Sequence, residues 1–344
     1  MGIVVAHRSV YASVMMVVSM LLALPLAANQ PRTTPADGSI RLRTPWGDPS
    51  FQGVWTNATI TPLERPPALA DKPFLTEEEV ADLEHRAEQD LFIERAPQPG
   101  DVGTYNRVWG DRGTRVAGGR TSLVVDPPDG RIPYTPDARK AQELTDAAYG
   151  MGSFNNHLEI DTGERCLTDG LPFVPYFYNN NYQILQTPQH VAILHEMYQE
   201  VRIIPLDGRP HVGPNVGQWL GDARGHWDGD TLVIETTNFD DKTHYRWAED
   251  WRASRPTLHL VERFTRVDEE TIDYQFTVTD PTMFTRPWTA AAPLWANRAA
   301  GATIGQLYEY ACHEGNYAMV NVLSGARAQE KAAAEGPSTE TSLK

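Results

Sequence analysis

Positive charge, cysteine and long hydrophobic runs are all scarce in this 344-residue chain. Thirty lysines and arginines stand against 45 aspartates and glutamates, so the formal net charge is −15. This charge argues against nucleic acid and anionic membrane surfaces as partners, and it favours a neutral or cationic small ligand. No hydrophobic run after the first 28 residues approaches the length of a transmembrane helix, so we expect no stable membrane insertion of the mature chain.

The sequence also lacks the motifs of several common active sites. It has ten histidines but no His-Glu-x-x-His, His-x-His or EF-hand loop. We therefore expect no metal, although His195, His211 and His313 are the residues from which strands would assemble one. A Gly-x-Ser-x-Gly nucleophile motif is missing, and the glycines between Arg112 and Arg120 are not followed by Lys-Ser or Lys-Thr. These absences predict a protein without a nucleotide or other cofactor.

The N-terminus has the pattern of an export signal. An apolar run from Val10 to Leu26 is followed by Ala27-Ala28 and polar sequence, which predicts a signal peptide over residues 1–28. An uncleaved anchor is the alternative. We expect a periplasmic or secreted protein with a flexible leader over residues 29–50, one β-rich domain over residues 51–327 and a frayed tail over residues 328–344.

Export bears on the two cysteines, Cys166 and Cys312. In an oxidising compartment we expect a disulfide between them, which would stabilise the fold by roughly 4–5 kcal/mol in the chain-entropy model. The alternative is a free Cys312 next to His313, which would make an activated thiolate.

Residues 183–211 hold the most informative pattern. Two extended runs flank a Pro-Gln step, and the second ends in the turn sequence Leu206-Asp-Gly-Arg209. From Val191 to Ile204 both alternating faces are polar in the middle and apolar at the ends. This pattern predicts a single strand in a barrel wall around a partly polar cavity.

The rest of the chain adds two helices and several hairpins. A capping box of Thr76 and Glu79 predicts one helix, and Thr135 before Pro136 predicts another that runs to about Ala148. We expect hairpins over residues 225–236 and 258–280, and a further strand over residues 307–311. Without a βαβ rhythm, this order predicts a mainly β fold: an antiparallel β-barrel or curved sandwich with N-terminal helices and long loops.

Several motifs resemble those of known proteins. Gly53-x-Trp55 resembles the opening of lipocalins and related calycin barrels. A wider set resembles a large family of mostly uncharacterised secreted bacterial proteins: Asn179–Gln183, Asp207–His211, Trp227–Glu235 with Asn238-Phe239, Glu262–Phe264 and Tyr310–Asn316. The resemblance covers most of residues 53–330. It implies an exported, calycin-like β fold and assigns no chemistry.

His313 is the first candidate for catalysis. Its unperturbed pKa near 6.5 suits proton transfer at neutral pH, and a carboxylate such as Glu196 or Glu262 would orient it. In one register of the predicted strands, His313 faces inward together with Glu196 and Arg202. The alternative is structural: a disulfide at Cys312 holds a turn that the side chains of residues 313–316 fix by hydrogen bonds.

A second group lies near the turn at residues 207–208. Arg202, Glu196 and His211 would bind and activate a polar substrate, or Arg202 would simply pair with Glu196 or Glu200. Asn179, Asn180, Asn181 and Tyr182 would donate hydrogen bonds to that substrate, or the asparagines would form left-handed turns.

We therefore expect a cofactor-independent enzyme that performs hydrolysis, elimination or isomerisation on a small polar or aromatic molecule. A non-catalytic ligand-binding barrel and a structural envelope protein are the alternatives. The three classes differ in their interiors: converging histidines and carboxylates at a cavity, an apolar cavity, or no cavity.

Overall fold

The chain folds around one antiparallel β-sheet that is nearly closed into a barrel. A computed structural model describes residues 42–90, 110, 113–152, 154–243, 251–253, 255–297 and 307–335. The predicted signal peptide and most of the predicted leader lie outside these residues. Residues 42–50 lie against the barrel, where Arg43 pairs with Asp230 across 3.0 Å.

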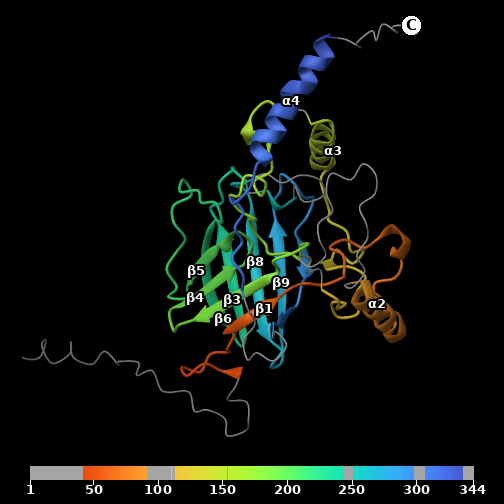
Figure 1. Cartoon of the computed structure of the whole chain (residues 1–344). Coiled ribbons are helices and arrows are strands. Elements are labelled where there is room, and N and C mark those ends of the chain that lie inside the picture. Colours follow the sequence, from red (N-terminus) through yellow and green to blue (C-terminus); the bar gives the residue numbers. More distant parts are fainter. Residues whose placement is uncertain are drawn as a thin grey trace, which may run out of the picture.

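The sheet contains eleven strands, and Figure 1 shows them around a common interior. Nine of them follow each other in the order β5-β4-β3-β1-β11-β9-β8-β7-β6, while β10 pairs with β9 and β2. Their bounds are Gly53–Thr56 (β1), Val124–Asp126 (β2), Asn181–Gln186 (β3), His190–His195 (β4), Val201–Pro205 (β5), Asp222–Asp228 (β6), Thr231–Thr237 (β7), His259–Arg266 (β8), Thr271–Thr279 (β9), Trp288–Ala291 (β10) and Leu294–Ala296 (β11). The mainly β, barrel-like fold predicted from the sequence is confirmed.

The barrel closes where β5 lies against β6, the two ends of this strand order. Gly225 of β6 makes the approach close. A Cβ atom there would lie 2.7 Å from a methyl carbon of Leu206 and 2.9 Å from one of Ile204. Since carbon atoms in contact normally stay 3.5–4.0 Å apart, a Cβ atom at this seam would force Leu206 and Ile204 to shift.

Alternating side chains fill the interior. In β9, Ile272, Tyr274, Phe276 and Val278 are fully buried, and the residues between them are half-buried. The adjacent β8 buries Leu260, Glu262 and Phe264 in the same way. This is the period of two that the sequence predicts for a strand with one wet face, and both predicted hairpins are confirmed.

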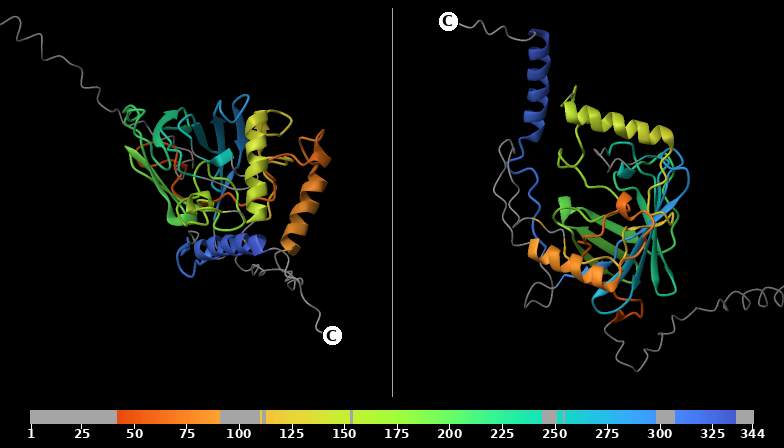
Figure 2. Two further views of the ribbon diagram at one scale, coloured as in Figure 1. Left: turned by 90° about the horizontal axis from the view of Figure 1, so that it is seen from above. Right: turned by 90° about the vertical axis from the view of Figure 1, so that its right-hand side faces the viewer.

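Among the described residues, three α-helices lie outside the barrel: α2 (Glu77–Asp90), α3 (Pro136–Met151) and α4 (Ala318–Glu335). Figures 1 and 2 show α3 and α4 at the same end of the barrel and α2 beside it. The capping box is present, since Thr76 N donates to Glu79 Oε2 over 2.8 Å and Glu79 N donates to Thr76 Oγ1 over 3.2 Å. Thr135 caps α3 through Ala138 N, as predicted.

Short 3-10 helices complete the secondary structure at Pro67–Leu69, His157–Glu159 and Met197–Gln199. The last of these corrects the sequence analysis. Residues 191–204 are not one strand, because the chain turns at residues 196–200 and forms the hairpin β4–β5. The turn moves Glu196 out of the strand and leaves Arg202 facing inward.

Two predictions for the C-terminal part are wrong. Residues 307–311 form no strand and pass instead into a turn at residues 312–315. Residues 328–335 are not frayed but continue α4, whose Ala326 packs against Phe154 and Ile160. Within the described residues, no helix is long and apolar enough to cross a membrane.

Candidate functional site

A buried ion pair crosses the middle of the barrel. Arg202 of β5 donates from Nη1 to Glu262 Oε1 over 3.0 Å and from Nη2 to Glu262 Oε2 over 2.6 Å. The Tyr274 hydroxyl donates to the same carboxylate over 2.9 Å, and Arg202 Nη2 also reaches Thr236 Oγ1 over 3.3 Å. The exposed fraction of the two charged side chains is 3% and 0%. Such charges are tolerated in a protein interior only when paired and hydrogen-bonded.

The Arg202–Glu262 pair shifts the pKa values of Arg202 and Tyr274. Burial acts to lower the pKa of Arg202, but the Glu262 carboxylate outweighs it and the pKa is raised. Burial, together with the negative charge of Glu262, raises the pKa of Tyr274 well above its usual range. Tyr274 therefore stays protonated and acts as a hydrogen-bond donor at neutral pH.

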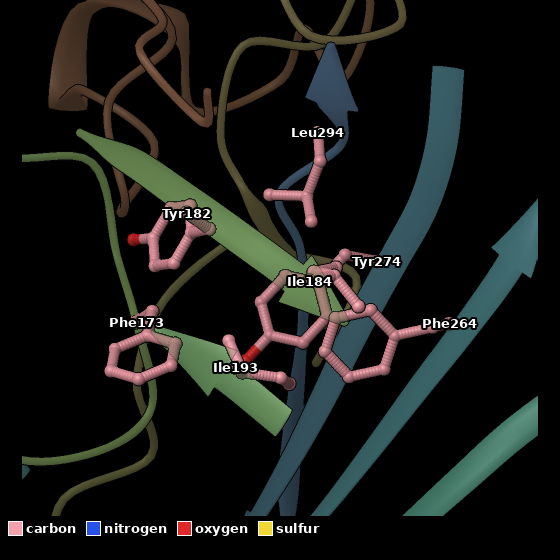
Figure 3. Close-up of a pocket in the computed structure, with 7 residues that line it drawn as sticks. All are labelled: Phe173, Tyr182, Ile184, Ile193, Phe264, Tyr274 and Leu294. Atoms are coloured by element: carbon pink, nitrogen blue, oxygen red, sulfur yellow. The ribbon is translucent and has the colours of Figure 1, made fainter. Parts of the chain in front are cut away.

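A small cavity lies beside the pair, and Figure 3 shows the side chains around it. The rings of Tyr182 and Tyr274 face this space from strands β3 and β9. The complete lining is Phe173, Tyr182, Ile184, Ile193, Phe264, Tyr274 and Leu294. The volume within which the centre of a water molecule can lie is about 10 Å³. The cavity therefore has room for about one water. An organic substrate does not fit in this cavity.

The disulfide end of the barrel, where the segment 161–180 covers the ends of β3 and β4, holds the larger cluster of polar groups. A disulfide between Cys166 and Cys312, with an S–S distance of 2.02 Å, links this segment to the C-terminal part of the chain. The predicted pairing of the two cysteines is confirmed. Asn316 Nδ2 adds a hydrogen bond of 3.1 Å to the Glu164 carbonyl. Residues 307–317 are thereby held against the segment 161–180.

At this end three aromatic rings pack together beneath the segment 161–180. The His195 ring lies parallel to that of Tyr182, with centroids 4.6 Å apart, and the Phe173 ring is 4.6 Å from His195. The Tyr182 hydroxyl accepts a hydrogen bond of 2.7 Å from Asn57 Nδ2. Burial, with a smaller effect from the Arg252 charge, lowers the pKa of His195 to about 3. His195 is therefore neutral at physiological pH.

A second buried ion pair and a carboxyl group lie next to this stack. Arg252 Nη2 donates to Asp169 Oδ2 over 2.8 Å and to the Asp169 carbonyl over 2.6 Å. Glu200 accepts hydrogen bonds from the Thr168 hydroxyl and, over 3.3 Å, from Asp169 N. Burial raises the pKa of Glu200 to about 7, the Asp169 charge adds to the rise, and the Thr168 hydrogen bond opposes it. Glu200 can thus exchange a proton near neutral pH.

The backbone around Glu200 is strained. Tyr198 and Gln199, which directly precede it, have φ angles of 55° and 53°, in the left-handed region that non-glycine residues rarely adopt. Cys166 and Asn179, on the covering segment, have φ angles of 56°. Four of the five described non-glycine residues with positive φ therefore lie at the disulfide end. Strain of this kind concentrates at functional sites, where the surrounding structure enforces it.

Tyrosine rings surround the turn that carries Glu200. Tyr198 meets Tyr310 edge to face at 4.9 Å, and Tyr178 stacks on Tyr310 at 6.1 Å. Tyr308 and Tyr317, on the same C-terminal segment, are exposed by 64% and 70%. Exposed and half-buried rings therefore lie beside polar groups at this end of the barrel.

Arg202, one of the predicted binding residues, is paired with Glu262 in the interior. The other predicted binding residues lie at the disulfide end, but protein groups already occupy them. Glu196 accepts hydrogen bonds from Asn181 Nδ2 and, over 2.9 Å, from Tyr308 N. Asn180 is buried and bonds through its amide to the backbone of Tyr176. The left-handed Asn179 bonds the His195 ring through its backbone. These residues build the end of the barrel.

The predicted catalytic residues do not converge. His313 is exposed in the turn beside the disulfide, Glu196 is buried in contact with Tyr308, and Arg202 pairs with Glu262 in the interior. The register that would bring His313, Glu196 and Arg202 to one cavity requires a strand at residues 307–313, which the structure lacks.

His211 lies elsewhere, against the start of β6. Its Nδ1 is 3.0 Å from Asp222 Oδ2, and Arg224 Nη1 is 2.6 Å from Asp222 Oδ1. Although burial acts to raise the pKa of Asp222, hydrogen bonds from Val212 N, His211 and Arg224 lower it. This arrangement fixes the loop between β5 and β6.

Sequence reasoning missed Asp169, Arg252 and the role of Glu200, which it treated only as a partner for Arg202. None of the three lies in a recognisable motif, and Asp169 and Arg252 are 83 residues apart. The one available signal was aromatic sequence nearby: Tyr198 before Glu200, Trp251 before Arg252 and residues 173–178 after Asp169.

Within the described part of the chain, no group of three or more histidine, cysteine, aspartate or glutamate side chains is placed to hold a metal ion. Comparisons with protein-family models, with curated proteins and with solved structures find no match for this chain.

Proposed function

We propose that this protein is an exported, cofactor-independent enzyme that transfers a proton to or from a small polar or aromatic molecule at the disulfide end, with Glu200 as its acid/base group. The proposal rests on the position of the Glu200 carboxylate. It is half-buried and held by Thr168 and Asp169 on a strained turn that tyrosine rings surround.

Several features support Glu200 in this role rather than Glu196 or His313. Glu196 is fully buried and receives hydrogen bonds from two protein groups, whereas Glu200 is partly accessible. A carboxyl group whose pKa is near the working pH is the most effective acid/base catalyst. The rings of Tyr198, Tyr178 and Tyr310 would bind the apolar face of a substrate next to it.

The proposal can be tested with two chromogenic probes that need only a base. In 5-nitrobenzisoxazole, a base removes the C3 proton, the C–H electron pair forms the nitrile and the N–O bond breaks to give a nitrophenolate. 4-Nitrophenyl acetate tests activation of water. We expect the wild-type protein to turn over at least one probe, with a rate that rises through about pH 7, and Glu200→Gln to lose roughly 10²-fold or more.

Glu235→Gln, on the outer face of β7, is the matched control and should keep the wild-type rate. A wild-type protein no faster than Glu200→Gln on both probes would overturn the proposal.

A further inference from the structure

Two hydrogen-bond donors contact the Glu200 carboxylate, one at each oxygen. The Thr168 hydroxyl donates to Glu200 Oε1, and Asp169 N donates to Glu200 Oε2 over 3.3 Å. Both donors come from adjacent residues of the segment 161–180. Because a free glutamate side chain rotates about several bonds, contacts to both oxygens fix the orientation of the carboxylate as well as its position.

The Thr168 hydroxyl is itself held in one orientation. The residue is 2% exposed, and its Oγ1 accepts a hydrogen bond of 2.9 Å from Gly170 N. A hydroxyl has a single hydrogen to donate, and that of Thr168 is directed to Glu200. A hydroxyl that donates to a carboxylate stabilises the charged form. Thr168 therefore acts on the proton affinity of Glu200 as well as on its orientation.

The Arg252–Asp169 pair fixes the backbone next to Thr168. Arg252 Nη2 donates to the Asp169 carbonyl over 2.6 Å and to the Asp169 carboxylate over 2.8 Å. The exposed fractions of the two side chains are 0% and 10%, so breaking the pair would leave a charge buried. One guanidinium group thus holds both the backbone and the side chain of the residue that follows Thr168.

From these contacts we propose that Thr168 is the positioning residue of the site: its hydroxyl orients the Glu200 carboxylate for proton transfer, and the Arg252–Asp169 pair keeps that hydroxyl in place. The inference rests on the proposed function of Glu200 and adds the residue that prepares this group. It does not require Thr168 to touch the substrate.

The neighbours of Glu200 give this role a distinct signature. Burial is the largest influence and raises the pKa of Glu200, and the Asp169 charge raises it further. The hydrogen bonds from Thr168 and Asp169 N lower the pKa, as does the Arg252 charge. Loss of the Thr168 hydroxyl alone should therefore raise the pKa, whereas loosened packing that admits water to the carboxyl group should lower it. The direction of the shift separates a positioning role from a merely structural one.

Carbon-13 NMR of the glutamate side-chain carboxyl groups measures this pKa and needs no substrate. Glu200→Gln identifies the Glu200 signal by its loss. Thr168→Val keeps the branched shape and removes the hydroxyl, so we expect its titration midpoint to lie about one pH unit above the wild-type value of about 7. Thr168→Ser keeps the hydroxyl and should titrate like the wild type.

Thr231→Val is the matched control. It removes a half-buried threonine hydroxyl that contacts Thr265 at the β6–β7 hairpin, away from Glu200, and should leave the midpoint unchanged. Circular dichroism checks that each variant is folded. Thr168→Ala serves the same comparison if Thr168→Val does not fold.

The chromogenic probes add a second readout. For Thr168→Val we expect the pH–rate profile to move upward with the NMR titration. The kcat at its high-pH plateau should fall roughly tenfold, because the carboxylate is no longer held in one orientation. KM should stay near the wild-type value, and Thr168→Ser should restore kcat.

A midpoint that is unchanged or lowered in folded Thr168→Val would overturn the inference. A Thr168→Ser variant that titrates like Thr168→Val would do the same. If the wild type turns over neither probe, the proposed function fails, and the NMR titrations decide separately whether Thr168 orients Glu200.

Discussion

Glu262 and Arg202 face each other across the barrel interior and share two hydrogen bonds, although β7 and β6 lie between their strands on the side of the seam. The pair fixes the distance between two walls of the barrel. It also accounts for the buried charge of Arg202, whereas the turn at residues 196–200 accounts for the polar middle of the 191–204 stretch.

Removing one partner of this pair should be strongly destabilising. Arg202→Met leaves the Glu262 carboxylate buried without its guanidinium, which typically costs about 3–5 kcal/mol. Urea unfolding followed by tryptophan fluorescence measures the loss. The double variant Arg202→Met/Glu262→Leu should recover a large part of it, because no charge is then left unpaired. A double variant as unstable as the single one would contradict this account.

The barrel seam should be sensitive to a single methyl group. Gly225→Ala places a Cβ atom 2.7 Å from Leu206 and 2.9 Å from Ile204, and we expect a loss of about 1–3 kcal/mol from overpacking. Gly213→Ala is the matched control, since a Cβ atom there meets nothing within 4 Å. Thermal unfolding of the two variants checks the difference. Equal melting temperatures would show that the seam is looser than described.

Acid should destabilise the protein through His195. The pKa of this residue is about 3 in the fold, against about 6.5 for a free histidine. Between these values the unfolded chain binds a proton that the folded chain does not, so stability present above pH 6.5 is lost as the pH falls towards 3. This contribution has a slope of about 1.4 kcal/mol per pH unit.

His195→Phe preserves a ring between Tyr182 and Phe173 and removes this titration. Urea unfolding at several pH values should therefore give a flatter profile for the variant than for the wild type. Parallel profiles from pH 6.5 to 4 would contradict this prediction. They would show that His195 binds its proton in the folded chain as it does in the unfolded chain.

The disulfide should hold the C-terminal segment in place. It closes a loop with a sequence separation of 146 residues, for which the chain-entropy model predicts about 5 kcal/mol of stabilisation. The double variant Cys166→Ala/Cys312→Ala should lose much of this stability. Its residues 307–317 should also become sensitive to limited proteolysis, as judged by mass spectrometry. An unchanged cleavage pattern would show that Glu196 and Asn316 suffice to hold the segment.

Local patterns in the sequence determined the secondary structure of the barrel. Val, Ile and aromatic residues at a period of two specify strands such as β8 and β9, and the Asp-Gly turn at residues 228–229 specifies its hairpin. The caps at Thr76 and Thr135 specify where helices begin. The cysteine pairing could also be predicted, because a chain with two cysteines offers only one intramolecular pairing.

Tertiary structure alone decided the candidate site. The turn at residues 196–200 requires a left-handed backbone at Tyr198 and Gln199, which their residue types do not reveal. It directs Glu196 towards Tyr308 and places Glu200 beside Asp169, 31 residues away in sequence. Periodicity reports which face of a strand is buried, whereas the pairing of distant charges depends on how the barrel closes. For that reason the sequence indicated several residues at the end of the barrel that holds the candidate site, and only the fold selected Glu200.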